Sequence, residues 1–392
     1  MSVPGRLRRV AVERLYGVKR RLLRAAPLLD RVGLRRLRVV DVGHARDLVG
    51  RSVENMNVLI PGGSVPFAAP EDEPFLRVSK HYSNGAFERP DVFVCDVPAG
   101  VVHVGTGLVL TAGGTIVEES ALSYRLRYTT VYEGLRPLRP LRIRGSVTTI
   151  VSVFGDNLWH WLIDSLPRLI SLRRALPASE PVTLILPDSL RTAQREILSP
   201  LLPSNIAVRI LPRREWVRAD RVILPSFVTG LANGFLPADY VHDIREGVFR
   251  GFSLPERAGP RGRIWVSREA DRHRRVRNER AVMECLAPLG FRSVRLAGLS
   301  AREQLEAFRN AEIVVGPQGA GLGWLLFSER IPAVVLYPNG IPNTFFLTQI
   351  RALRQEHVFL LHGAPDEDDD FDADVARLRA IVERAVTPTI SA

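Results

Sequence analysis

Short apolar runs rich in β-branched residues alternate with helical patterns through the last third of the chain. Strands that alternate with helices in this way form parallel sheets, so the segment predicts a doubly wound α/β domain of the nucleotide-binding type. The expected strands are RIWVS (263–267), FRSVRL (291–296), AEIVVG (311–316), PAVVLYP (332–338) and HVFLL (357–361), with helices near 278–287, 300–309, 320–327, 342–354 and 373–386.

The preceding part of the chain mixes two patterns. Between residues 91 and 120, short β-rich runs are interrupted by Pro-Ala-Gly, Gly-Thr-Gly and Gly-Gly, which predicts two or three antiparallel strands. Later apolar runs with an intervening helix predict βαβ units and a second, Rossmann-like sheet; they lie at 182–186, 207–211 and 221–225, with the helix near 189–199. We expect irregular structure at 50–80, a connecting helix at 239–252 and a linker at 253–262, hence an arm at 1–45 and domains at 46–252 and 263–392.

The stretch GDNLWHWLIDSLPRL (155–169) predicts a helix with two different faces. Leucines spaced by three and four form an apolar side, and polar and aromatic residues at the same spacing form another stripe. Such a stripe faces either bulk water or a cleft. It consists of Asn157, His160, Trp161, Asp164 and Arg168.

This stripe carries the residue types of a general base and a substrate-binding surface. A histidine one turn from an aspartate can act as a base in a fixed tautomer, so His160 is the candidate base and Asp164 the alternative. Asn157 and Arg168 can bind hydroxyls or an acidic group, and tryptophans can stack on a sugar. The simpler interpretation is a structural histidine.

A glycine-rich turn, VVGPQGAGLGWLLFS (314–328), joins an expected strand to an expected helix. Its free amides and the positive end of the helix dipole favour a phosphate group. The candidate residues are Gln318, Gly319, Ala320, Gly321 and Leu322. Alternatively, the glycines only allow close packing of the helix on the sheet.

An arginine-rich loop, SREADRHRRVRNE (267–279), follows the first strand of the same domain. Guanidinium groups pair well with diphosphate oxygens, so Arg268, Arg274 and Arg275 are candidate ligands, with Asn278 and Glu279 at the helix start. A solvated basic loop is the alternative. The acidic run DEDDD (366–370) is interpreted as a solvated loop that favours the following helix, with metal binding as the alternative.

Charge is concentrated at one end of the chain. The net charge is +12 over 392 residues, and residues 1–38 contribute +10 of it, with leucines and valines interleaved. The nearly neutral remainder argues against a nucleic-acid-binding protein. The arm predicts a basic amphipathic helix on an anionic membrane surface, or else a helix that is solvated or packed on the protein itself.

The sequence shows neither a secretory signal nor an apolar run of membrane-spanning length. Cys95 and Cys285 suit reduced residues of a cytoplasmic protein.

Together NLWHWLIDSLPRL (157–169), SREADRHRRVRNE (267–279) and GPQGAGLGWLLF (316–327) resemble glycosyltransferase family 61. The resemblance implies a GT-B fold, in which two Rossmann-type domains face a cleft, and inverting transfer from a nucleotide sugar to a hydroxyl of a glycan or lipid-linked glycan. It implies capsular or cell-surface polysaccharide synthesis by a cytoplasmic, possibly membrane-associated enzyme without metal or other cofactor. Asn157, Trp161 and Arg168 then become candidate acceptor ligands.

One position departs from the family pattern. The family usually reads Gly-x-His-Gly-Ala-Gly-Leu, and Gln318 stands in place of the histidine. Glutamine can donate a hydrogen bond but cannot carry a proton or a positive charge. The alternative function is therefore a weakly active or inactive homologue that binds nucleotide or glycan as a scaffold.

Overall fold

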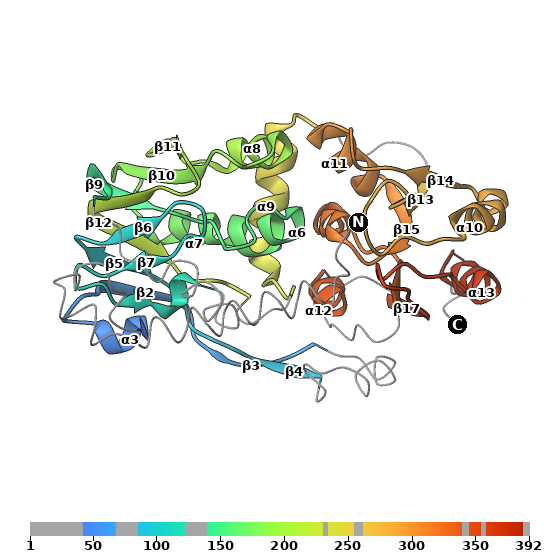
Figure 1. Ribbon diagram of the computed structural model, residues 1–392, viewed down its shortest axis with the longest axis horizontal. Coiled ribbons are helices and arrows are strands. Elements are labelled where there is room, and N and C mark those ends of the chain that lie inside the picture. The colour runs from blue at the N-terminus through green and yellow to red at the C-terminus, as the bar shows by residue number, and fades with distance from the viewer. Residues whose placement is uncertain are drawn as a thin grey trace. The chain divides into compact units, whose positions relative to one another are not determined.

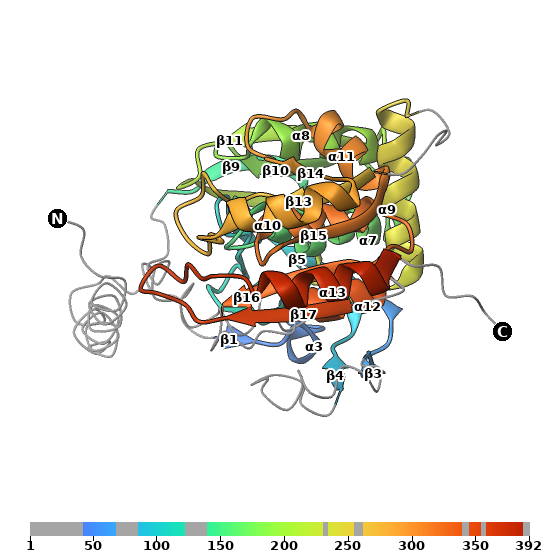
Figure 2. The ribbon, with the colours of Figure 1, turned by 90° about the vertical axis from the view of Figure 1, so that its right-hand side faces the viewer.

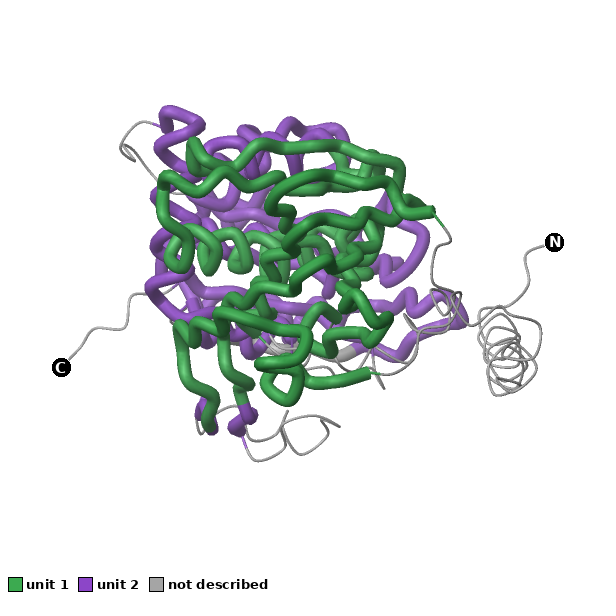
Figure 3. The backbone as a smooth tube through the Cα atoms, turned by 90° about the vertical axis from the view of Figure 1, so that its left-hand side faces the viewer, with its two compact units in different colours: residues 1–63, 89–191, 202–232 green, residues 64–88, 192–201, 233–392 purple. Residues whose placement is uncertain are grey.

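The chain divides into two compact units in a computed structural model. It describes residues 42–67, 85–121, 139–229, 234–254, 262–338, 345–353 and 358–386. Unit 1 comprises residues 1–63, 89–191 and 202–232, and unit 2 comprises residues 64–88, 192–201 and 233–392 (Figure 3). Apart from residues 42–45, the predicted basic arm lies outside the described residues.

Unit 1 is built on a ten-stranded mixed sheet (Figure 1). The Rossmann-like part is parallel, as predicted, with β12 next to β9, β9 next to β10 and β10 next to β11. Antiparallel strands β5 and β6 pair with β12, and β6, β7 and β8 form a meander. The strands are β1 (Val42–Gly43), β2 (Glu54–Ile60), β5 (Val92–Pro98), β6 (Val101–His103), β7 (Val109–Leu110), β8 (Ile116–Val117), β9 (Leu141–Thr148), β10 (Val182–Pro187), β11 (Ile206–Leu211) and β12 (Trp216–Pro225).

The antiparallel strands predicted between residues 91 and 120 are confirmed, but two strands lie where irregular structure was predicted. These are β2 and the short β3 (Gly63–Pro66), which pairs with β4 (Ala86–Arg89). The sequence of β2, ENMNVLI, begins with poor strand formers and is mostly exposed, and its pairing with β5 contains two register shifts. The extended conformation of β2 therefore depends on its pairing with β5, which is distant in the sequence, rather than on local strand propensity.

Unit 2 contains the predicted five-stranded parallel sheet. Its order is β14-β13-β15-β16-β17, with every neighbouring pair parallel. The strands are β13 (Gly262–Val266), β14 (Phe291–Val294), β15 (Ala311–Pro317), β16 (Ala333–Pro338) and β17 (Val358–Gly363). The α/β fold class with parallel sheets is thus confirmed.

Helices cover both faces of this sheet. Figures 1 and 2 show α10 and α13 on one face, and Figure 1 shows α11 and α12 on the other. A core cluster that includes Trp265, Ile313, Leu336, Leu286 and Val382 joins α10 and α13 to the strands. The bounds are α10 (Glu279–Leu286), α11 (Ala301–Arg309), the 3-10 helix η8 (Ala320–Phe327), α12 (Phe345–Ala352) and α13 (Val375–Val386), with α8 (Thr192–Leu198) and α9 (Ala238–Gly251) also in this unit.

The strand order of unit 2 defines where its ligand site is expected. Counted along the chain, the order is 2-1-3-4-5, which places the topological switch point between β13 and β15. The loop after β13 contains the arginines, and the turn after β15 contains Gln318 and Gly319. The fold therefore brings the two predicted donor-binding motifs to the same point.

Neither cysteine forms a disulfide. Cys95 is buried in β5, where burial raises the pKa of its thiol, and Cys285 is half-buried on α10. Across the described ranges, none of the helices combines the length and the apolar character needed to cross a membrane.

Candidate active site

The helix predicted at residues 155–169 begins with an asparagine cap. It comprises α6 (Leu158–His160), a π-helical turn η5 (Trp161–Ser165) and α7 (Leu166–Ala175). The side-chain oxygen of Asn157 accepts hydrogen bonds from the backbone amides of Trp159 (2.9 Å) and His160 (3.5 Å). Asn157 thus fixes the start of the helix, and its carbonyl oxygen is used for that purpose.

His160 and Asp164 form the predicted pair. Nδ1 of His160 lies 2.6 Å from Oδ2 of Asp164, which is buried. The other carboxylate oxygen, Oδ1, accepts a hydrogen bond from the hydroxyl of Thr229 at 3.2 Å. Both oxygens of Asp164 are therefore held, one by the histidine and one by a residue that follows β12.

The imidazole of His160 is held in one orientation by its neighbours. It stacks on Phe154 with 4.9 Å between ring centroids and meets the edge of Trp159 at 5.0 Å. Because Nδ1 donates to the carboxylate, Nε2 is the free acceptor, and among the described residues Nε2 has no hydrogen-bond partner. The His160 side chain retains 14% exposure, so Nε2 can meet a substrate.

Arg168 and Trp161 lie in the interior of unit 1 and are fully buried. The guanidinium of Arg168 donates to the carbonyl oxygens of Pro225 (2.9 Å) and Val151 (2.8 Å) and lies 4.4 Å from the centre of the Phe227 ring. Burial lowers the pKa of Arg168 to about 9, and the carboxylate of Asp164 opposes that effect. The predicted stripe is therefore not one continuous surface, because Arg168, which the polar pattern places outside, lies in the interior and donates to backbone carbonyls.

In unit 2, Arg268 from the loop after β13 lies against Gly319 from the turn after β15. A Cβ atom on Gly319 would collide with Nη1 of Arg268, so glycine at this position leaves the space that the guanidinium occupies. Gly321 has a packing role, since its Cβ would lie 2.5 Å from the Leu296 side chain. The two interpretations of the glycine-rich turn thus apply to different glycines: Gly319 lies at the candidate anion site, and Gly321 allows close packing.

The turn also presents unused polar groups. The backbone amide of Gln318 donates to the backbone carbonyl of Leu336 at 2.8 Å. The side-chain oxygen Oε1 of Gln318 is buried and has no hydrogen-bond partner among the described residues. The first bond of η8 runs from the amide of Leu322 to the carbonyl of Gly319. The amides of Ala320 and Gly321 therefore have no partner within the helix, which favours an anion.

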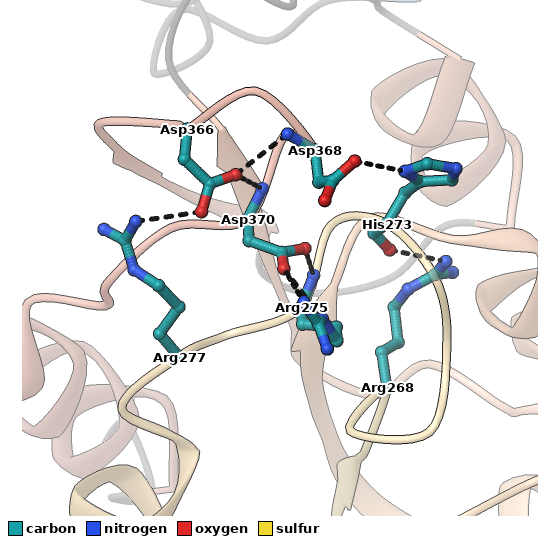
Figure 4. Close-up of polar contacts among 7 residues, drawn as sticks. All are labelled: Arg268, His273, Arg275, Arg277, Asp366, Asp368 and Asp370. Atoms are coloured by element: carbon teal, nitrogen blue, oxygen red, sulfur yellow. Dashed lines mark hydrogen bonds and ion pairs between the residues drawn. The ribbon is translucent and has the colours of Figure 1, made fainter. Parts of the chain in front are cut away.

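The arginines of the loop fall into two groups. Arg275 is paired with Asp370, and Arg277 is paired with Asp366 (Figure 4). Arg277 also pairs with Asp372, which follows the acidic run. Arg268 and Arg274 are partly buried, and burial lowers the pKa of both. Among the described residues, the Arg274 guanidinium has no hydrogen bond or ion pair. Arg268 and Arg274 are therefore the cations best placed for an anion.

The remaining candidates lie beside this group. Both side-chain amide atoms of Asn278 bond to the backbone of Ala373, each at 2.8 Å. Glu279 is the first residue of α10, and its buried Oε2 is unpaired among the described residues. Neither Thr229 nor the acidic partners of Arg275 and Arg277 had a local sequence signal, because each lies 65 or more residues from its partner.

In the part of the chain that the structure describes, no three histidine, cysteine, aspartate or glutamate side chains come together as a metal site. The acidic run, read in one alternative as a metal site, instead binds arginines and backbone amides. Its carboxylates compensate the positive charge of the neighbouring loop.

Comparisons with known proteins find a matching family model and similar solved structures. Two solved structures of E. coli heptosyltransferase WaaC, with ADP and with ADP-2-deoxy-2-fluoro heptose, are similar at 12% identity. Their TM-scores are 0.32 and 0.28; each match covers 62% of this chain and 99% or 100% of the other. No curated protein matches. The family resemblance inferred from the motifs is confirmed for residues 158–335, which match the family described as glycosyltransferase 61.

Proposed function

We propose that this glycosyltransferase uses a nucleotide-sugar donor, inverts the anomeric centre and transfers the sugar to a hydroxyl of a glycan or lipid-linked glycan. The observation that carries the proposal is the contact of Arg268 with Gly319 at the switch point of the unit 2 sheet. Two partly buried guanidinium groups and the amides at the start of η8 suit the diphosphate that all such donors share. The GT-B architecture implied by the family is part of this proposal.

In the proposed reaction, Nε2 of His160 removes the proton of the acceptor hydroxyl while its oxygen attacks the anomeric carbon. The bond from that carbon to the donor phosphate breaks, and its electron pair leaves with the diphosphate. Arg268, Arg274 and the amides of Ala320 and Gly321 stabilise the leaving negative charge. A single displacement on the opposite face of the sugar gives inversion, and the cations of the site supply the charge compensation without a metal ion.

The base assignment is tested with His160→Ala and Asp164→Asn. A thermal-shift screen of the wild-type protein against nucleotide sugars first identifies the donor, because a ligand bound only by the folded state raises the melting temperature. We expect each variant to lose about 10²-fold or more in kcat, the usual size of a general-base contribution, with donor affinity unchanged. The exposed His242→Ala variant is the matched control, and full activity in both test variants would rule out the base.

A scaffold function is the second candidate, because Gln318 replaces the family histidine. Calorimetric titration of the wild-type protein with nucleoside diphosphates, followed by a donor-hydrolysis assay, separates the two: nucleoside diphosphate binding without hydrolysis or transfer favours the scaffold. Gln318→His then provides a check, since a gain of turnover would assign the missing chemistry to this position.

We also propose that the protein works at the cytoplasmic face of the plasma membrane, in capsular or other cell-surface polysaccharide synthesis. The family resemblance and the basic residues 1–38 support this setting. Outside that arm the net charge is close to neutral, which supports a glycan rather than a nucleic acid as the partner.

A further inference from the structure

Two loops far apart in the sequence are joined in unit 2. The arginine loop (residues 267–278) follows β13, and the acidic loop (residues 366–372) precedes α13. Backbone hydrogen bonds connect the loops like a short β-ladder, so they form one structural element. The bonds run from Arg274 N to Asp368 O (3.2 Å), from Phe371 N to Arg275 O (3.0 Å) and from Arg277 N to Phe371 O (2.9 Å).

Asp370 is the centre of this connection. It is 1% exposed, whereas the other carboxylates of the acidic loop are exposed. Its Oδ1 accepts the backbone amide of Arg275 at 2.7 Å, and its Oδ2 accepts Nε of the same arginine at 2.7 Å (Figure 4). One buried carboxylate therefore fixes both the backbone and the side chain of Arg275.

The bonds to Asp370 and Asp368 flank Arg274. Arg274 has φ +59°, a left-handed conformation that costs a residue with a Cβ roughly 1 kcal/mol. Its amide is held by Asp368, and the next amide is held by Asp370. This conformation therefore persists because the acidic loop holds the backbone on both sides of Arg274.

The arginine that this backbone presents lies near Arg268. Burial and the charge of Arg274 both lower the pKa of Arg268, and Nε of Arg268 is buried with no partner among the described residues. Arg268 is oriented by the carbonyl of His273 at 3.1 Å and by Asp271 at 3.1 Å. Two neighbouring cations with unused donors match an anion that carries two charges.

We propose that Asp370 is a positioning residue for donor binding: through Arg275 it holds the arginine loop in the conformation in which Arg268 and Arg274 bind the donor diphosphate. This inference rests on the proposed function of the same site. Arg275 is then a structural partner of Asp370 rather than a diphosphate ligand.

The direction in which anion affinity changes when the Asp370 carboxylate is removed distinguishes a positioning role from simple electrostatic repulsion. Removing a carboxylate near an anion site weakens repulsion and tightens anion binding. If Arg275 itself bound the diphosphate, releasing it from Asp370 would also tighten binding. A positioning role predicts the opposite result, because the loop that carries Arg274 would lose its anchor.

The experiment is a calorimetric titration of the full chain with inorganic pyrophosphate, well below the melting temperature. We expect Asp370→Asn to raise the Kd by about tenfold, the effect of losing one charge-assisted interaction. Arg275→Lys keeps the charge but loses the Nε donor, so the Kd rises in the same direction by a smaller factor. Should Asp370→Asn fail to fold, Asp370→Glu decides the question, because it keeps the negative charge and displaces only the carboxylate: a positioning role raises the Kd, whereas a purely electrostatic role leaves the Kd equal.

Asp372→Asn is the matched control, because Asp372 is an exposed carboxylate of the same loop that pairs with Arg277. We expect its Kd to stay equal or fall. A folded Asp370→Asn protein with equal or tighter pyrophosphate binding, whatever its melting temperature, overturns the positioning role and leaves the proposed function standing. Absence of pyrophosphate and nucleoside diphosphate binding by the wild-type protein overturns both.

Discussion

Thr229 completes the arrangement around the candidate base, although it is 65 residues from Asp164 in the sequence. A carboxylate that orients a histidine can rotate unless its second oxygen is also held. Thr229 supplies that second contact from the segment after β12, so strand and helix together set the direction of the imidazole.

The contribution of this hydroxyl can be measured with Thr229→Val, which keeps the shape of the side chain and removes the donor. Leaving Oδ1 of the buried Asp164 unpaired costs roughly 1–2 kcal/mol, so kcat/KM should fall about tenfold. Thr229→Ser keeps the hydroxyl and should retain nearly full activity. Steady-state transfer assays compare the two variants, and equal losses in both would show that the hydroxyl has no such role.

At this scale the sequence predicted contacts within one helical turn and missed contacts across the fold. The i, i+4 spacing was sufficient for His160 and Asp164. The same spacing placed Arg168 on the polar stripe, whereas the structure buries it. Periodicity cannot show that the backbone carbonyls of Val151 and Pro225 are available as acceptors in the interior. The arginine loop presented a similar difficulty, since the partners of Arg275 and Arg277 come from the other end of the unit.

At the level of elements, Arg168 joins the helix α7 to two strand ends. Its guanidinium links the carbonyl of Val151, after β9, to that of Pro225, at the end of β12. The planar guanidinium reaches both acceptors at once, which an ammonium group cannot reproduce.

Arg168→Lys should therefore lower the free energy of unfolding by about 2–4 kcal/mol, because a buried charge keeps only part of its hydrogen bonding. Arg173→Lys, an exposed change on the same helix, should alter it by less than about 0.5 kcal/mol. Chemical denaturation of both variants measures the difference, and equal stability would contradict the structural role of Arg168.

Elements with strong periodicity were predicted well and elements made by pairing were not. All five strands of the unit 2 sheet lie within a few residues of their predicted positions, because buried parallel strands are continuous apolar runs. In contrast β9 (LRIRGSVT) was not predicted: its first four residues alternate between apolar and polar, but Gly145 interrupts the pattern, and β10 and β12 pair with it on either side.

For the molecule as a whole, a buried histidine links stability to acid. His103 in β6 is 5% exposed, lies 2.7 Å from the Thr106 hydroxyl through Nδ1 and packs on Trp216. Burial, helped by the charge of Arg213, lowers its pKa from 6.5 to about 4. The unfolded chain therefore binds a proton on this residue at a pH where the folded protein does not.

The stabilising contribution of neutral His103 is present above pH 6.5 and is lost as the pH falls toward 4. Between pH 7 and pH 5 the loss is about 2 kcal/mol in the free energy of unfolding. His103→Gln should remove this part of the pH dependence, and the exposed His242→Gln should not. Calorimetric melting at both pH values tests this, and parallel wild-type and His103→Gln curves would contradict it.

Charge distribution sets the second property of the whole molecule. Residues 1–38 hold +10 of the net +12, so attraction to anionic lipid should depend on them. Deletion of residues 1–38 should abolish co-sedimentation with phosphatidylserine-containing liposomes, and 0.5 M salt should weaken binding of the full chain. Equal binding by the full chain and the deletion variant would exclude the arm as the attachment site.

The ladder between the arginine and acidic loops has a practical consequence for dissecting this enzyme. The family match ends at residue 335, yet the groups that hold Arg275 and Arg277 come from residues 366–372. A fragment that ends at residue 335 would lack Phe371, which pairs with Val276 and packs in the same core cluster. It would also lack the carboxylates that bind Arg275 and Arg277. Deletions from the carboxyl terminus should consequently stop short of α13 if the proposed diphosphate site is to be kept.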